Sequence, residues 1–246
     1  MGGEDWKRQR RIVEKAFSLQ NLKKASKVFV KKAGLIVDDW GRKGFVEDIQ
    51  PYFDCSSFDV IGLSNFNFDS KALENYIRKD HSQLGLYEYF LVAKRGTFRT
   101  LHFLFPILER LPTKGNRQVM DSMHKTKQIL SEITNIRRLS EANQDRDLLD
   151  MLLQQADEGN ISETEVHSNL FLFFLAGSDT TASTLTMCLY YLAIHPNFQE
   201  RAREECKQLK ELSYESYSQL NFLLSFVKEV LRKFVSVFVY TLILTS

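Results

Sequence analysis

The sequence predicts an all-α protein, and three observations support this prediction. Proline occurs only 4 times in 246 residues, and apolar residues recur at helical spacing through most of the chain. Short clusters of turn formers, such as NFNFDS (65–70) and LPTKGN (111–116), separate the periodic segments. With 43% hydrophobic residues, the chain can bury a core. One large domain or two small ones fit this length.

The expected helices follow one another between breaks at Gly41 to Gly44, the two clusters above, DEGNIS (157–162) and HisPro (195–196). Their boundaries are loose by several residues. They cover 4–17, 20–40, 46–63, 71–94, 98–109, 115–140, 145–157, 162–194, 196–211 and 217–233.

Composition excludes several classes of protein. The net charge is +2, from 33 basic and 31 acidic residues, and this balance argues against a nucleic-acid-binding protein. Cys55, Cys188 and Cys206 are widely spaced without a CxxC pair, so we expect unpaired thiols in a reducing compartment. The start, MGGEDWKRQRR, lacks the apolar stretch of a signal peptide or membrane anchor.

The segment from Ser162 to His195 is the most informative. Ser162 and Glu165 form a capping-box pattern, and Pro196 ends the segment, which gives a helix of about 32 residues and roughly 48 Å. Residues 170–176 are wholly apolar, but Asp179 and six nearby Ser and Thr residues argue against a membrane span. We therefore expect a long buried helix with one polar notch.

Gly177 lies beside this notch. Glycine in a helix interior is destabilising, so it tends to occur where another group approaches the backbone closely. Asp179 and the adjacent hydroxyls would add a proton source and a hydrogen-bond donor, as activation of a small bound molecule requires. The alternative is a glycine packing contact with Asp179 exposed at a kink.

AlaGlySerAspThrThr (176–181) resembles the [AG]Gx[DE]T[TS] signature of the long distal helix in cytochrome P-450 haem-thiolate monooxygenases. The flanking segments 147–166 and 195–206 also resemble that family. The resemblance implies the central portion of the P-450 fold with haem b as cofactor. It also implies that Ala176 and Gly177 lie against the haem, that Thr180 hydrogen-bonds the bound dioxygen, and that Asp179 relays protons.

Two weaker motifs fit the same family. Trp6 and Arg10 resemble its WxxxR element, which binds a haem propionate, although a solvated basic helix is an alternative. Glu229 and Arg232 resemble its ExxR element, which implies a buried structural ion pair. Glu200 and Arg203 match the same pattern, but there we expect an ordinary exposed pair.

After Arg232 the sequence departs from the family pattern, because no FxxGxRxCxG loop follows and the axial cysteine that would ligate the iron is missing. We therefore expect residues 1–232 to form an incomplete P-450 domain without the family's N-terminal anchor region, and 233–246 to form a divergent apolar tail. The chain as written is expected to be inactive.

The resemblance implies a parent enzyme that inserts one oxygen atom from dioxygen into an apolar small-molecule substrate, with electrons from a flavoprotein reductase or a small redox protein. The first helix is basic and would receive that partner, although a solvated face explains its charge equally well. A eukaryotic full-length parent would lie at the cytoplasmic face of the endoplasmic reticulum membrane. The alternative function is a non-catalytic helical protein without haem, acting through exposed core surface. The basic residues of this helix are Lys7, Arg8, Arg10, Arg11 and Lys15.

Overall fold

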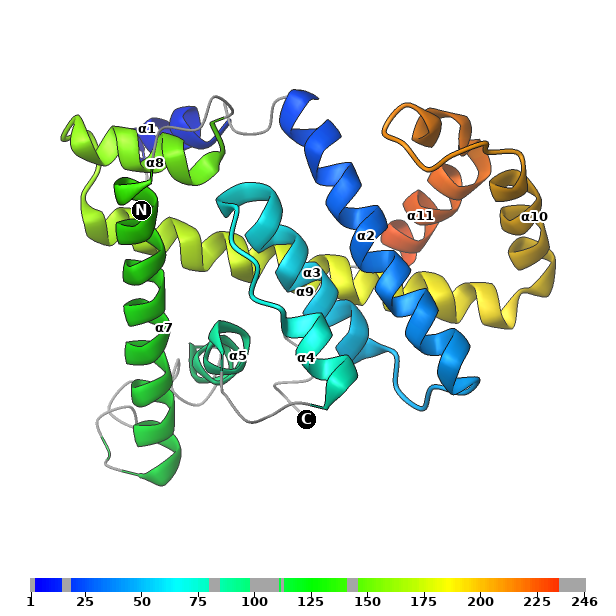
Figure 1. The fold of residues 1–246 in the computed structure, drawn as a ribbon, viewed down its shortest axis with the longest axis horizontal. Helices are drawn as coiled ribbons and strands as arrows, with labels where there is room; N and C mark the ends of the chain where they lie inside the picture. Colours follow the sequence, from blue (N-terminus) through cyan, green and yellow to red (C-terminus); the bar gives the residue numbers. More distant parts are fainter. Residues whose placement is uncertain are drawn as a thin grey trace.

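The structure is a computed structural model that describes residues 3–14, 19–79, 85–97, 111, 113–140 and 146–234 (Figure 1). These residues contain helices and no β-strand, so the all-α prediction is confirmed for them. The α-helices are α1 (Glu4–Glu14), α2 (Leu19–Lys43), α3 (Gln50–Phe66), α4 (Ala72–Arg78), α5 (Leu86–Thr97), α7 (Lys114–Leu139), α8 (Leu148–Asp157), α9 (Glu163–Ile194), α10 (Pro196–Lys207) and α11 (Asn221–Lys233).

Helix α9 is the axis of the fold, and it runs through the middle of the molecule in Figure 1. Both groups of the predicted capping box are present, because Ser162 Oγ accepts from the Glu165 N–H and the Glu165 carboxylate accepts from the Ser162 N–H. The helix ends at Ile194, directly before the predicted His195–Pro196 break. Its 32 residues match the predicted length.

The main core lies where α3 and α5 pack against α9. Phe58 of α3 stacks on Phe174 of α9 with 4.5 Å between ring centroids, and Phe90 of α5 lies 5.1 Å from Phe58. These rings are almost wholly removed from water and belong to one apolar cluster with leucines of α8. Their burial supplies much of the hydrophobic stabilisation of this half of the molecule.

A second, polar interaction joins α2, α3 and the start of α4. Lys32 is fully buried, and its Nζ lies 2.8 Å from Asp59 Oδ2, 2.8 Å from Glu74 Oε2 and 3.3 Å from Asp69 Oδ1. Asp59 also accepts from the backbone N–H groups of residues 72 and 73. Because no side chain of the preceding residue caps α4, the Asp59 carboxylate satisfies the free N–H groups of its first turn.

The single helix expected over 71–94 is wrong, because the structure forms α4 and α5 instead. Lys79 ends α4 in the left-handed conformation, with φ of 55°, which turns the chain away from the helix axis. The expectation rested on apolar spacing, which continues across the interruption and does not report backbone direction.

Two further expected boundaries are shifted, and one expected helix falls outside the described residues. Helix α2 continues through the expected break at Gly41 and ends before Gly44, which has φ of +70°. The segment 217–233 divides into a 3₁₀ turn, Ser216–Gln219, and α11. The helix expected over 98–109 lies outside the described residues.

Helices α10 and α11 close the C-terminal end of α9. Phe226 and Val230 of α11 pack against Cys188 of α9 in a small apolar cluster. Within the described part of the chain, no helix is long and apolar enough to cross a bilayer. The membrane-span alternative for 162–195 is therefore not supported.

The Lys32 cluster gives a stability prediction. Lys32→Met should lower the free energy of unfolding by about 3–5 kcal/mol, because it leaves the buried Asp59 carboxylate without its cation. Urea denaturation followed by circular dichroism measures the change. Lys31→Met, an exposed position on the same helix, is the matched control and should leave stability unchanged. Equal stability of the two variants would contradict the prediction.

Candidate active site

One face of α9 is left open by the surrounding helices. Leu172 is 55% exposed, and Ala176, one turn later, is also exposed. Thr180 lies one turn after Ala176, and its hydroxyl donates to the Ala176 carbonyl oxygen at 2.8 Å. Because residues four apart share a helix face, these three residues form an apolar surface that ends in one hydroxyl. We call Leu172, Ala176 and Thr180 the open face.

Asp179 is buried beside this face, as the sequence predicted. Its side chain is turned about 100° from Thr180 around the helix and lies against α5, where its Oδ1 is 2.7 Å from Lys94 Nζ. Both side chains are nearly buried, with 10% and 13% exposure. The alternative that placed Asp179 exposed at a kink is therefore wrong.

A second carboxyl group stands close to this ion pair. Burial raises the pKa of Asp54, and the charge of Asp179 acts in the same direction, whereas Lys94 and the hydrogen bond from Gln50 act against it. Lys94 thus pairs with the buried Asp179 and acts electrostatically on Asp54, which is half-buried. Sequence reasoning missed Lys94 and Asp54, because 85 residues separate Lys94 from Asp179 and no local pattern links them.

Gly177 is explained by helix packing. A Cβ atom at this position would lie 2.3 Å from Cδ1 and 2.6 Å from Cγ1 of Ile61 on α3. The close approach that the glycine permits is therefore to α3, not to the open face that Ala176 and Thr180 share. This geometry favours the packing alternative for Gly177, and the contact with a haem stays a prediction.

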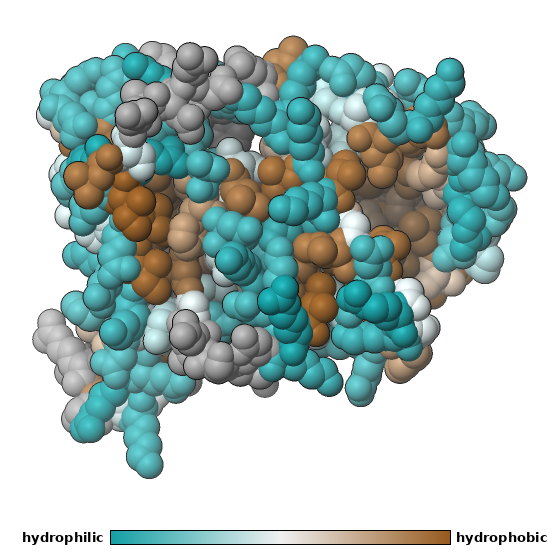
Figure 2. Space-filling model, viewed as in Figure 1, coloured by the Kyte–Doolittle hydropathy of each residue, from teal (hydrophilic) through white to brown (hydrophobic). Residues whose placement is uncertain are grey.

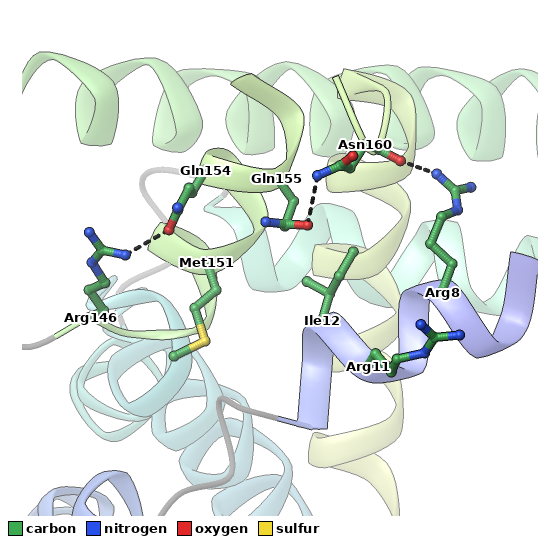
Figure 3. Close-up of a pocket in the computed structure, with 8 residues that line it drawn as sticks. All are labelled: Arg8, Arg11, Ile12, Arg146, Met151, Gln154, Gln155 and Asn160. Carbon is green, nitrogen blue, oxygen red and sulfur yellow. Dashed lines mark hydrogen bonds between the residues drawn. The ribbon is translucent and has the colours of Figure 1, made fainter. Parts of the chain in front are cut away.

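The WxxxR residues lie on α1. Trp6 falls within this helix, but its side chain is outside the described part, and Arg10 is exposed. The neighbouring Arg8 anchors α1 to the start of α9, because it donates to Glu165 at 2.9 Å and to the carbonyl oxygen of Asn160. Figure 3 shows the resulting cleft between α1 and α8, with a volume of about 480 Å³.

The ExxR residues form the predicted ion pair, but it is not buried. Arg232 Nη2 lies 2.7 Å from Glu229 Oε1, and the Arg232 and Glu229 side chains are 69% and 50% exposed. Phe226 and Val230 are the buried side chains of α11. No helix of the described residues covers the side of α11 that carries Glu229. The hydrogen bond from Arg232 holds the pKa of Glu229 below its usual value. Glu200 and Arg203 form the expected exposed pair, at 2.8 Å.

All three cysteines are free thiols, as expected. Cys55 on α3 and Cys188 on α9 are buried, and Cys206 on α10 is exposed. Burial raises the pKa of Cys55 to about 12, which disfavours the thiolate form. None of the three belongs to the open face of α9.

The comparisons with known proteins agree with the motifs. The cytochrome P450 family model matches residues 1–241. The chain belongs to the cytochrome P450 family. Cytochrome P450 4F11 of Homo sapiens is 28% identical over 94% of this chain and 48% of its own length. Cytochrome P450 72A552 of Barbarea vulgaris is 31% identical over 94% of this chain and 46% of its own length.

Solved structures show the same fold at lower identity. The cytochrome P450 CYP102L1 superposes with a TM-score of 0.79 at 20% identity, over 94% of this chain and 54% of that one. The retinoic acid-bound cyanobacterial CYP120A1 gives a TM-score of 0.72 at 22% identity, over 94% of this chain and 49% of that one. The described helices thus have the arrangement of a P450 portion. The chain spans about half the length of the curated relatives it matches.

The described residues offer a surface for one side of a haem, the cofactor expected of this family, but they offer no ligand for its iron. The open face presents exposed Leu172 and Ala176 and the Thr180 hydroxyl, which suits contact with a flat apolar ring. The cysteines, in contrast, do not offer a thiolate ligand at this face.

The contact between Gly177 and Ile61 can be tested by a double-mutant cycle. Gly177→Ala should destabilise the chain by about 1–3 kcal/mol, because the added methyl overlaps Ile61. Ile61→Ala removes the two overlapping atoms, so the double variant should be more stable than the sum of the single effects predicts. Gly34→Ala on α2, where a Cβ meets no atom within 4 Å, should be slightly stabilising. Additive effects would contradict the proposed overlap.

The raised pKa of Asp54 predicts a pH-dependent gain on neutralisation. Because the folded state disfavours the ionised carboxyl, stability falls as pH rises from the ordinary pKa of 3.8 through the raised folded value. Asp54→Asn should therefore be more stable than the parent chain at pH 7 and equal to it below pH 3.8. Thermal unfolding at several pH values measures this, with Asp38→Asn, an exposed position on α2, as the control. A parallel offset at all pH values would contradict it.

Proposed function

We propose that this chain is the distal-helix portion of a cytochrome P450 monooxygenase, which inserts one oxygen atom from dioxygen into an apolar organic substrate. The observation that carries the proposal is the open face of α9, where Thr180 directly follows Asp179, the buried partner of Lys94. An apolar helix face that carries one hydroxyl group, with a buried ion pair at the adjoining residue, is suited to oxygen activation away from bulk water.

Haem b would supply the redox chemistry that activates dioxygen when it is bound. On this chain, Ala176 and Leu172 would contact its ring, and the Trp6 and Arg10 side chains of α1 would hold a propionate. The axial thiolate is not one of the three cysteines in this proposal, so the chain as written is inactive.

Thr180 is the proposed proton donor to the dioxygen substrate. Its hydroxyl carries a single proton, which is donated to the Ala176 carbonyl oxygen in the structure. Rotation of the hydroxyl about the Cα–Cβ bond would turn this proton toward the open face. Asp179 would take up a proton from solvent and pass it to Thr180, and Lys94 would hold the ionised carboxylate in place between transfers.

The domain division and the partners are also proposals. Residues 1–232 would form the P450 portion and 233–246 a divergent tail, although the family match extends to residue 241. Arg10 and Arg11 remain exposed on α1, and their charge supports an acidic flavoprotein reductase or small redox protein as the electron donor.

The proposal is tested on the full-length product of the longest transcript, with haem and a reductase. Thr180→Val should lower product formation about 100-fold or more, because a positioned proton donor contributes that much. Thr184→Val is the matched control, since Thr184 also bonds back to a carbonyl of α9, at 2.7 Å, and is not assigned a proton role. Rates of product formation and of oxygen consumption separate lost chemistry from lost oxygen uptake.

Equal rates for the two variants would overturn the assigned role of Thr180. If every transcript ends in TLILTS and the purified chain folds stably without taking up haem, the monooxygenase proposal fails. The non-catalytic alternative would then be favoured.

A further inference from the structure

A cavity lies where α7 crosses the first half of α9 (Figure 1), and the proposed oxygen chemistry does not use it. It has a volume of about 350 Å³, which is within the range of small-molecule sites. The residues of α9 that line it end at Phe171, which lies about 14 Å from Thr180 along the helix axis. The cavity is therefore separate from the part of the open face that carries Thr180.

Part of the cavity lining is apolar and accessible. Met123 and Leu130 of α7 and Phe171 of α9 contribute to it. Met123 is 39% exposed and Phe171 is half-buried, so a bound molecule can contact both side chains. Thr126 also lines the cavity, but its hydroxyl oxygen has almost no accessible surface and is out of reach of a bound molecule. The lining therefore favours a ligand with an apolar body.

The cavity carries a single positive charge at pH 7.5, from Lys127 of α7. Burial lowers the pKa of His167, and the charges of Lys127 and Arg138 act in the same direction, whereas Glu163 acts against them, so the imidazole is neutral. None of the described residues that line the cavity is acidic, and Glu163 is paired with Arg138. Within the described part of the chain, Lys127 has no ion-pair partner. The charge of the cavity therefore favours an anion.

The uncharged polar groups of the lining supply one more free donor. Ser168 donates its only proton to the Thr164 carbonyl oxygen at 2.7 Å. The Nε2–H of His167 is directed at Thr134 Oγ1, 3.4 Å away, because the Thr134 hydroxyl gives its own proton to the backbone. The Thr164 hydroxyl, in contrast, is exposed and has no hydrogen-bond partner among the described residues. Lys127 and Thr164 are thus the two donors that a ligand can use.

We propose that this cavity binds an apolar molecule with one carboxylate group, which accepts from Lys127 Nζ and from the Thr164 hydroxyl. The apolar body contacts Met123, Leu130 and Phe171. An ionised carboxylate has only acceptor atoms, and these match the two free donors. A hydrocarbon would gain the apolar contact alone, and a neutral phenol would lack the charge that pairs with Lys127. An amine would place a second positive charge beside Lys127.

The test uses the whole 246-residue chain at pH 7.5, with 2-naphthoate, 2-naphthol and naphthalene as probes and ¹³C-methyl methionine NMR as the readout. Of the 5 methionines, Met123 lines the cavity, and its signal, assigned with Met123→Leu, should shift during titration. The 2-naphthoate should bind more tightly than the two uncharged probes. Lys127→Gln should weaken 2-naphthoate binding about two- to fivefold and leave naphthalene binding unchanged, because only the ion pair is lost.

Lys125→Gln is the matched control, because Lys125 is also exposed on α7 but does not line the cavity. It should not change the affinity for any probe. Thr164→Val should also weaken 2-naphthoate binding, but less than Lys127→Gln does. The proposal is overturned if 2-naphthoate binds no more tightly than 2-naphthol, or if Lys127→Gln and Lys125→Gln have the same effect. A shift of the Met187 or Met151 signal without one of Met123 would also overturn it. None of these results depends on haem, so they are independent of the proposed monooxygenase function.

Discussion

The close packing of α3 on α9 is the constraint on which the rest of the structure depends. At the crossing, Gly177 admits Ile61 of α3, whereas a Cβ at Gly62 would first meet the Phe68 carbonyl oxygen, at 2.5 Å, and Phe174 only at 3.4 Å. Gly177 thus lets the helices approach closely beside the point where Phe58 and Phe174 stack. Because α3 covers one side of α9 so tightly, the opposite side carrying Ala176 is the one left open.

Helix α3 also organises the buried charges. Asp59 on α3 pairs with Lys32 of α2, and the charge of Lys94 of α5 acts on Asp54, five residues before Asp59. An unpaired ion at either depth would be strongly destabilising, so each lysine fixes the helix that carries it relative to α3. The groups around Lys32 and Lys94 have different structural effects. Lys32 satisfies acids that hold the start of α4, whereas Lys94 divides its charge between Asp54 and Asp179, a residue adjacent to Thr180.

The sequence was sufficient for features that depend on neighbouring residues. The Ser162 capping box and Pro196 fixed the ends of α9, because caps and prolines act over one helical turn. The partner of Asp179 could not be inferred, since Lys94 lies 85 residues away and reaches it only through the packing of α5. The close neighbour of Gly177 was also hidden, because a glycine reports that something approaches and does not report what.

The Glu229–Arg232 pair shows why spacing and burial are separate questions. An i, i+3 separation places two side chains on neighbouring parts of a helix, so Glu229 and Arg232 can pair at 2.7 Å although both side chains are half or more exposed. Its energetic weight depends on what covers it, because water screens an exposed pair and a buried pair loses its hydration. Leu224 and Leu231 of the same helix are each 46% exposed. A surface that covered them together with the pair would therefore gain apolar contact while converting a weak ion pair into a structural one.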